Sequence, residues 1–133
     1  MTAGKNGNEP LRLYLNMHDE LYVIDLEQTA YFMADDHYTH VYYIGGVRFM
    51  VPFGLSRIEE RFVLMAVHNP HPFKRVGRKY IVNTSLIHNI NVTKQTLTLM
   101  AGGKMLALQM SKPVLRDLLA EVASETLRQG GPY

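Results

Sequence analysis

The stretch F-K-R-V-G-R-K-Y-I-V-N, residues 73–83, places four cationic side chains directly before a run of strand-forming residues. The cations are Lys74, Arg75, Arg78 and Lys79. Long cationic side chains can neutralise phosphates, and arginine can also bind guanine through two hydrogen bonds in the major groove. The stretch therefore predicts a polyanion-binding element next to a strand at 79–82. A solvated basic surface without a partner would have the same composition.

Charge is distributed unevenly on either side of this stretch. Residues 1–60 contain four Lys or Arg against nine Asp or Glu, whereas residues 61–116 contain nine Lys or Arg and no acid. The overall net charge of +2 hides this asymmetry. If the fold gathers the cations of residues 61–116 on one side, that side would attract a polyanion.

Short runs of β-forming residues, separated by turn residues, make up most of the chain. Residues 11–15 alternate apolar and polar side chains, as a half-buried strand does. Residues 41–44 and 47–51 flank Gly45-Gly46, a pair that can adopt the positive φ angles of a tight hairpin. Further strands are predicted at 21–24, 30–34, 87–92, 96–100 and 105–108, with a second Gly-Gly turn at 102–103.

Two segments have a helical period instead. Leu55, Ile58 and Phe62 fall on one face of a predicted helix over residues 55–62. A C-terminal helix is predicted after Ser111, which can cap it. Its apolar stripe consists of Leu115, Leu118, Leu119 and Val122. The chain is therefore predicted to be mainly β, with a short middle helix and a C-terminal helix, and without the βαβ alternation of parallel sheets.

Composition excludes several classes of protein. The 133 residues include no cysteine, which excludes disulfides, thiolate zinc sites and cysteine nucleophiles. No apolar run approaches the roughly 18–20 residues of a membrane span. We expect one cytoplasmic domain over residues 11–128, with a flexible lead at 1–10, a flexible tail at 129–133 and no membrane partner.

The motifs of metal sites and active sites are missing. His37 and His40, like His68 and His71, have an i, i+3 spacing that brings side chains together on a helix but on opposite faces of a strand. Neither pair lies on a predicted helix, and no zinc hydrolase motif, nucleophile elbow, P-loop or dinucleotide motif is present. We expect no catalytic residue, metal site, cofactor or small-molecule substrate.

Four motifs, in the same order, resemble the LytTR family of bacterial DNA-binding domains. Residues 73–83 resemble F-x-R-x-H-R-S-Y-I-V-N, and Ile87 and Ile90 match the I-x-x-I that follows it. Residues 30–41 resemble I-x-Y-I-E-A-x-x-N-Y-V-x-I, residues 53–59 resemble S-L-x-x-L-E, and residues 103–112 resemble G-x-x-L-P-V-S-R. The resemblance is collinear over roughly residues 11–120, which is nearly the whole chain.

This resemblance implies an elongated fold of several antiparallel sheets, in which loops enter successive major grooves of double-stranded DNA. It implies a sequence-specific transcription regulator, such as a response regulator effector domain, bound to direct repeats with a homodimer on the DNA as one arrangement. The implied contacts are His37, Tyr38, Thr39 and His40 in a first loop, Arg78 and Lys79 in a second, and Lys112 in a third. Arg75 would contact a phosphate or form a structural ion pair, and both roles stay open.

Several positions depart from the family pattern. Gly77 replaces a histidine, Lys79 replaces a small polar residue, and Lys112 replaces an arginine whose two-pronged contact lysine cannot form. Asp35 and Asp36 add negative charge at the first loop. The segment over residues 63–72, between the middle helix and the cation-rich stretch, is longer than the usual connection. The two aspartates and the histidine missing at Gly77 motivate an alternative function, a non-enzymatic protein-interaction module that retains the LytTR fold.

Overall fold

A computed structural model describes residues 10–128, in which ten strands form three antiparallel sheets. The two-stranded sheet pairs β1 (Arg12–Met17) with β2 (Glu20–Asp25). The five-stranded sheet, in the order β5-β4-β3-β7-β6, contains β3 (Thr29–Asp35), β4 (Tyr38–Tyr43), β5 (Arg48–Val51), β6 (Phe73–Val76) and β7 (Tyr80–Asn83). The three-stranded sheet, in the order β10-β9-β8, contains β8 (Ile87–Asn91), β9 (Thr96–Ala101) and β10 (Lys104–Gln109).

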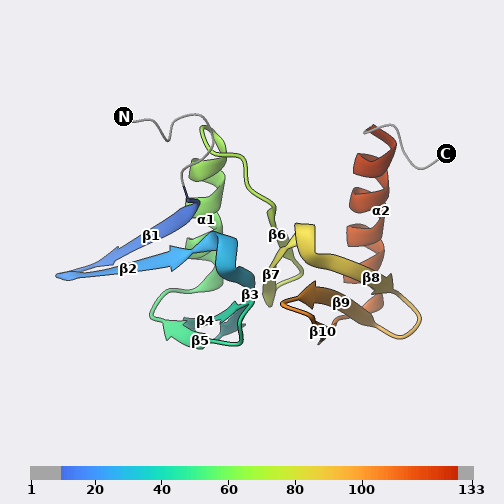
Figure 1. The fold of residues 1–133 in the computed structure, drawn as a ribbon, viewed down its shortest axis with the longest axis horizontal. Helices are drawn as coiled ribbons and strands as arrows, with labels where there is room; N and C mark the ends of the chain where they lie inside the picture. The colour runs from blue at the N-terminus through green and yellow to red at the C-terminus, as the bar shows by residue number, and fades with distance from the viewer. Residues whose placement is uncertain (1–9, 129–133) are drawn as a thin grey trace.

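Two helices complete the fold, α1 (Leu55–Ala66) and α2 (Lys112–Arg128), and short 3-10 turns precede β3 and β8. Figure 1 shows β1, β2 and α1 towards one end of the long axis and β8–β10 with α2 towards the other, with the five-stranded sheet between them. The predicted class, mainly β with several antiparallel sheets and two helices, is confirmed.

The five-stranded sheet is covered on both faces. Successive side chains of a strand point to opposite faces, so Phe32 packs into a different core from Tyr31 and Met33. In β7, Ile81 joins the same core as Phe32, whereas Val82 joins the other. This double burial explains why β3 and β7 are apolar at nearly every position instead of alternating with polar residues.

The first core lies between the five-stranded sheet, α1 and the β1–β2 ribbon. Phe32 is fully buried at its centre, with its ring edge-on to Phe62 of α1 at 5.6 Å and to Phe73 of β6 at 5.9 Å between centroids. The buried residues that α1 contributes are Leu55, Ile58 and Phe62. The helical face predicted from residues 55–62 is therefore confirmed.

The second core lies between the other face of the sheet, β8–β10 and α2. Leu97 and Leu99 of β9 are fully buried in it, together with Leu115 of α2. The predicted stripe of α2 is confirmed for Leu115 and Leu118, and Val122 packs against this core, but Leu119 is 45% exposed. The angular position of Leu119 on the helix turns it away from the sheet.

Two segments differ from the sequence prediction. The middle helix, predicted over residues 55–62, continues four residues past Phe62 to Ala66, although Val63 and Leu64 are more than half exposed. The first part of the long connection at 63–72 is therefore helical. Residues 73–76 form β6, a strand that the sequence analysis did not predict. β6 is an edge strand that pairs only with β7, and an edge position tolerates polar side chains.

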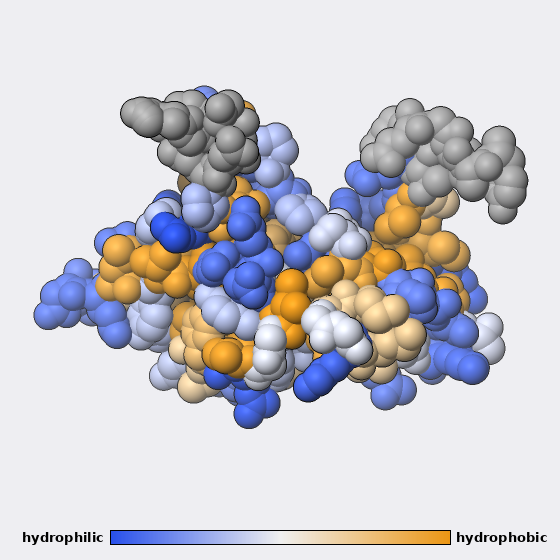
Figure 2. Space-filling model, viewed as in Figure 1, coloured by the Kyte–Doolittle hydropathy of each residue, from blue (hydrophilic) through white to orange (hydrophobic). Residues whose placement is uncertain are grey.

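Among residues 10–128, no other element covers the outer face of the β1–β2 ribbon. Leu13, Leu15 and Ile24 point into the first core, so their neighbours point outward. The outward apolar side chains are Tyr14, Leu21 and Val23, which are 46%, 51% and 46% exposed. Figure 2 shows hydrophobic residues at the surface over this ribbon.

The predicted flexible lead and tail lie outside the described residues, except for Pro10. Within residues 10–128, neither helix combines the length and the hydropathy that crossing a bilayer requires.

The partly buried phenol of Tyr31 should make the stability of the fold depend on pH in the alkaline range. Its ring stacks on Tyr42 with 4.3 Å between centroids, and burial raises the pKa of Tyr31 from 10.0 to about 12. Between these pH values the unfolded chain loses a proton that the native chain keeps, so the free energy of unfolding falls as pH rises through this window. We expect Tyr31→Phe to reduce this fall in urea titrations. The matched control is Tyr14→Phe, and an equal fall in both variants would show that Tyr31 is not responsible.

Candidate nucleic-acid interface

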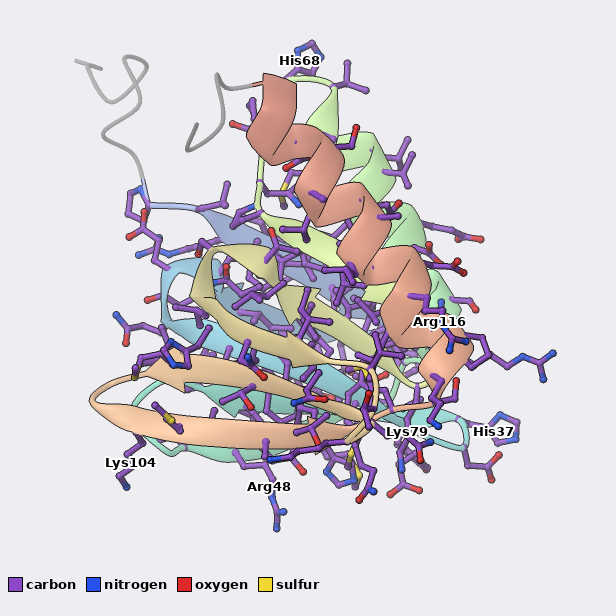
Figure 3. The ribbon with its side chains drawn as sticks, turned by 90° about the vertical axis from the view of Figure 1, so that its right-hand side faces the viewer. His37, Arg48, His68, Lys79, Lys104 and Arg116 are labelled. Carbon is purple, nitrogen blue, oxygen red and sulfur yellow. The ribbon has the colours of Figure 1, made fainter. Side chains whose placement is uncertain are left out.

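Three segments that are distant in sequence meet at the β6–β7 turn, residues 77–79. The backbone N–H of Ala34, near the end of β3, donates to the Lys79 carbonyl oxygen at 2.8 Å. On the other side, Gly77 lies against Val114 in the first turn of α2, where a Cβ built on Gly77 would be 3.2 Å from Val114 Cγ2. The β6–β7 turn therefore joins the β3–β4 hairpin to the start of α2. Figure 3 shows His37, Lys79 and Arg116, one from each segment, on the same side of the molecule.

The β6–β7 turn exposes the two cations predicted for the second contact loop. Arg78 and Lys79 are both exposed, and Lys79 Nζ lies 5.9 Å from the centroid of the Tyr80 ring. Gly77 begins the turn with φ +66°, in the left-handed region that favours glycine. This backbone conformation and the contact with Val114 explain why glycine occupies a position where the resemblance leads one to expect histidine.

Arg75 forms the structural ion pair that was one of its two predicted roles. Its Nη1 donates to Glu59 Oε1 of α1 at 2.8 Å. Its Nε donates to the Gly77 carbonyl oxygen at 3.1 Å, and its Nη2 donates to the Arg78 carbonyl oxygen at 2.9 Å. The side chain is only 21% exposed. Each guanidinium nitrogen thus has an acceptor within the protein.

The first predicted loop is partly turn and partly strand. His37 lies in the β3–β4 turn and is 90% exposed, and Tyr38, the first residue of β4, is 46% exposed. His40 is 20% exposed, and its Nε2 lies 2.8 Å from Asp35 Oδ2. His37 and Tyr38 thus present free surface, while His40 is held at the base of the hairpin.

The predicted contact role of Thr39 needs correction. Thr39 is fully buried, and its Oγ1 donates to the Phe53 carbonyl oxygen at 2.7 Å. The sequence motif suggested a turn, but residue 39 is the second residue of β4, where the strand alternation points it inward. In this conformation the Thr39 side chain is not accessible to a ligand.

The start of α2 provides a third group of cations. Lys112 is its first residue and is exposed. Arg116 lies one turn later, on the same helical face, and is also exposed. Arg116 is one of the cations of residues 61–116, and it was not predicted to contact a ligand. The i, i+4 spacing from Lys112, on a helix that begins at residue 112, is the signal that identifies it.

Negative charge also occurs on this side. Asp36 is 81% exposed at φ +57°, and its Oδ1 lies 3.8 Å from His37 Nε2. Asp35 is 60% exposed and accepts from His40. Each aspartate therefore stands beside a histidine. Among residues 10–128, no three His, Asp or Glu side chains are grouped so that they could hold a metal ion.

The model of the LytTr DNA-binding domain family matches residues 19–120. The chain belongs to this family. A similar solved structure is the LytTr DNA-binding domain of a Bacillus cereus protein described as a methyl-accepting/DNA response regulator. It is 20% identical, covers 83% of this chain and 94% of its own, and superposes with a TM-score of 0.53, a likeness that shows the LytTr fold alone. No curated protein matches the chain.

A substitution of Gly77 in this LytTR chain tests the backbone conformation of the β6–β7 turn directly. We expect Gly77→Ala to lower the free energy of unfolding by about 1–2 kcal/mol, because an L-residue is disfavoured in the left-handed region. Urea denaturation measures this change. The control is Gly45→Ala, where the added Cβ would meet nothing within 4 Å. Equal stability of the two variants would contradict the strain assigned to Gly77.

Proposed function

We propose that this chain binds double-stranded DNA sequence-specifically, through loops inserted in the major groove, and thereby regulates bacterial transcription. One observation carries the proposal. The β3–β4 turn, the β6–β7 turn and the start of α2 meet on one side, each with exposed polar or cationic side chains. LytTR is a family of DNA-binding domains rather than of enzymes.

The proposed roles follow from the chemistry and exposure of each side chain. Arg78 reads a base, because an exposed arginine can donate two hydrogen bonds to guanine. His37 and Tyr38 contact the next groove, with His40 supporting the hairpin beside them. The phosphate contacts are Lys79, Lys112 and Arg116. Thr39 is not included because it is buried.

The proposed partner is a duplex that carries direct repeats, with two copies of the chain on one operator as a homodimer. Copies on a direct repeat share one orientation, so any contact between them is head-to-tail rather than two-fold symmetric. The proposed place of action is the bacterial cytoplasm.

Selection of bound duplexes from a random pool at near-physiological salt tests this function. We expect a short repeated motif and an affinity that falls steeply with salt, because neutralised phosphates release counterions. On that motif, Arg78→Ala should cost roughly 1–3 kcal/mol and relax specificity at one position, whereas Lys79→Ala should weaken all duplexes similarly and lower the salt slope by about 1.

Lys104→Ala is the control for these variants, because Figure 3 shows Lys104 away from the side that carries Lys79. Its binding should equal that of the parent. If Arg78→Ala discriminated between specific and random duplexes as well as the parent does, Arg78 would not read a base.

Asp36 should weaken DNA binding through its exposed carboxylate. We expect Asp36→Asn to raise affinity about two- to five-fold at low salt, which corresponds to ~0.5–1 kcal/mol for one exposed charge. Asparagine also tolerates the positive φ of this position. Asp19→Asn, in the β1–β2 turn, removes the same charge elsewhere and should leave affinity unchanged. An unchanged affinity of Asp36→Asn would place this carboxylate away from the phosphates.

A second candidate function rests on the uncovered ribbon face. Tyr14, Leu21 and Val23 form an exposed apolar surface, as protein-binding surfaces often do. We propose as the alternative a non-enzymatic protein-interaction module with the LytTR fold. Absence of any duplex binding at low salt, together with a partner protein whose binding is lost in Val23→Lys, would support the alternative over DNA binding.

A further inference from the structure

We infer that Arg75 is a positioning residue that holds the β6–β7 turn in its DNA-binding shape, and that Glu59 of α1 anchors Arg75 in this role. The inference deepens the proposed function and rests on it for its DNA-binding readout. It assigns to α1, which carries none of the proposed contacts, a part in sequence discrimination.

The first step concerns the backbone of the turn. Arg75 stands in β6 opposite Ile81, and its guanidinium reaches forward over the turn that follows. It donates to the carbonyl oxygens of Gly77 and Arg78, and the Lys79 carbonyl oxygen accepts from the N–H of Ala34. All three carbonyl groups of residues 77–79 therefore have a partner, which fixes the peptide planes that carry Arg78 and Lys79.

The second step concerns the anchor. Glu59 Oε1 accepts from Arg75 Nη1 at 2.8 Å, and both side chains are partly shielded, at 43% and 21% exposure. The neighbouring residue of α1, Ile58, is fully buried in the first core. The carboxylate is thus mounted on a helix that cannot shift without disturbing that core. A charge-assisted hydrogen bond of this kind is stronger than a neutral one.

The third step separates positioning from direct contact with DNA. Three of the five N–H donors of the Arg75 guanidinium already bond the Glu59 carboxylate and two backbone carbonyls, which leaves two donors for a phosphate unless these bonds break. A lysine at this position would retain the charge but lose the planar fork that serves three acceptors. The Arg75→Lys variant therefore tests the planar guanidinium separately from its positive charge.

The two roles predict opposite effects of Glu59→Ala. If Arg75 contacts phosphate, removing Glu59 frees the guanidinium and deletes a negative charge, so affinity for DNA rises. If Arg75 positions the turn, removing Glu59 loosens the guanidinium and the turn, so affinity for the specific duplex falls. The sign of one measurement thus decides between them.

The experiment measures dissociation constants for the selected duplex and for a scrambled duplex over a range of salt concentrations. We expect Glu59→Ala and Arg75→Lys each to weaken binding of the selected duplex about ten-fold, as loss of a charge-assisted hydrogen bond would. Binding of the scrambled duplex and the salt slope should stay near those of the parent, because the phosphate-binding cations remain. Glu59→Gln keeps an oxygen acceptor and should recover most of the loss.

Glu60→Ala is the matched control, since it removes the same charge from the adjacent, exposed position of α1. It should bind both duplexes like the parent. A tighter complex for Glu59→Ala, or parental discrimination in Arg75→Lys, would overturn the inference while leaving the proposed function intact. Absence of duplex binding by the parent would instead refute the proposed function.

A measurement without DNA tests the inference even if the parent protein binds no duplex. Backbone ¹⁵N relaxation should show greater mobility of Arg78 and Lys79 in Glu59→Ala than in Glu60→Ala, with the signals of the two cores unchanged in both. Equal mobility of the turn in the two variants would show that Glu59 does not anchor it, whatever the protein binds.

Discussion

The five-stranded sheet must bury both of its faces, and the rest of the molecule follows from this constraint. Phe32 lies on one face of β3 and Tyr31 on the other, so a single layer packed on the sheet cannot bury both side chains. The chain provides two, α1 with the β1–β2 ribbon and α2 with β8–β10. These layers lie on opposite sides of the sheet, and this arrangement gives the fold its length and leaves the strand ends accessible.

The candidate interface forms at those strand ends because the sheet order brings them together. β3 and β7 are neighbours although about fifty residues separate them, so the β3–β4 and β6–β7 turns emerge side by side. The second core then brings α2 close enough for Val114 to touch Gly77. No local sequence signal encodes this meeting point. It results from the packing of two cores that share one sheet.

The parts that were predictable from sequence are those governed by local periodicity and turn chemistry. The hairpins at Gly45-Gly46 and Gly102-Gly103 belong here, as do the buried faces of both helices apart from Leu119. Thr39 and β6 were missed because their state depends on partners: strand pairing turns Thr39 inward, and pairing with β7 makes a strand of a cation-rich segment. Arg75 could not be assigned before its acceptors were known, since Glu59 lies sixteen residues earlier in the chain.

The placement of charge at the start of α2 is hard to explain by stability. Cations near a helix N-terminus oppose the helix dipole, yet Lys112 opens α2 and its first turn contains no acid. The cations of this surface therefore interact unfavourably with the helix dipole, and Asp35 and Asp36 reduce the positive potential of the neighbouring turn. Such a surface is poorly suited to attract anions indiscriminately. Its cations lie at separate points, Arg78 and Lys79 on a turn whose carbonyls are all bonded and Lys112 and Arg116 on α2. Such an arrangement favours a ligand with phosphates at fixed spacings over one that offers only charge, and duplex DNA has that regularity.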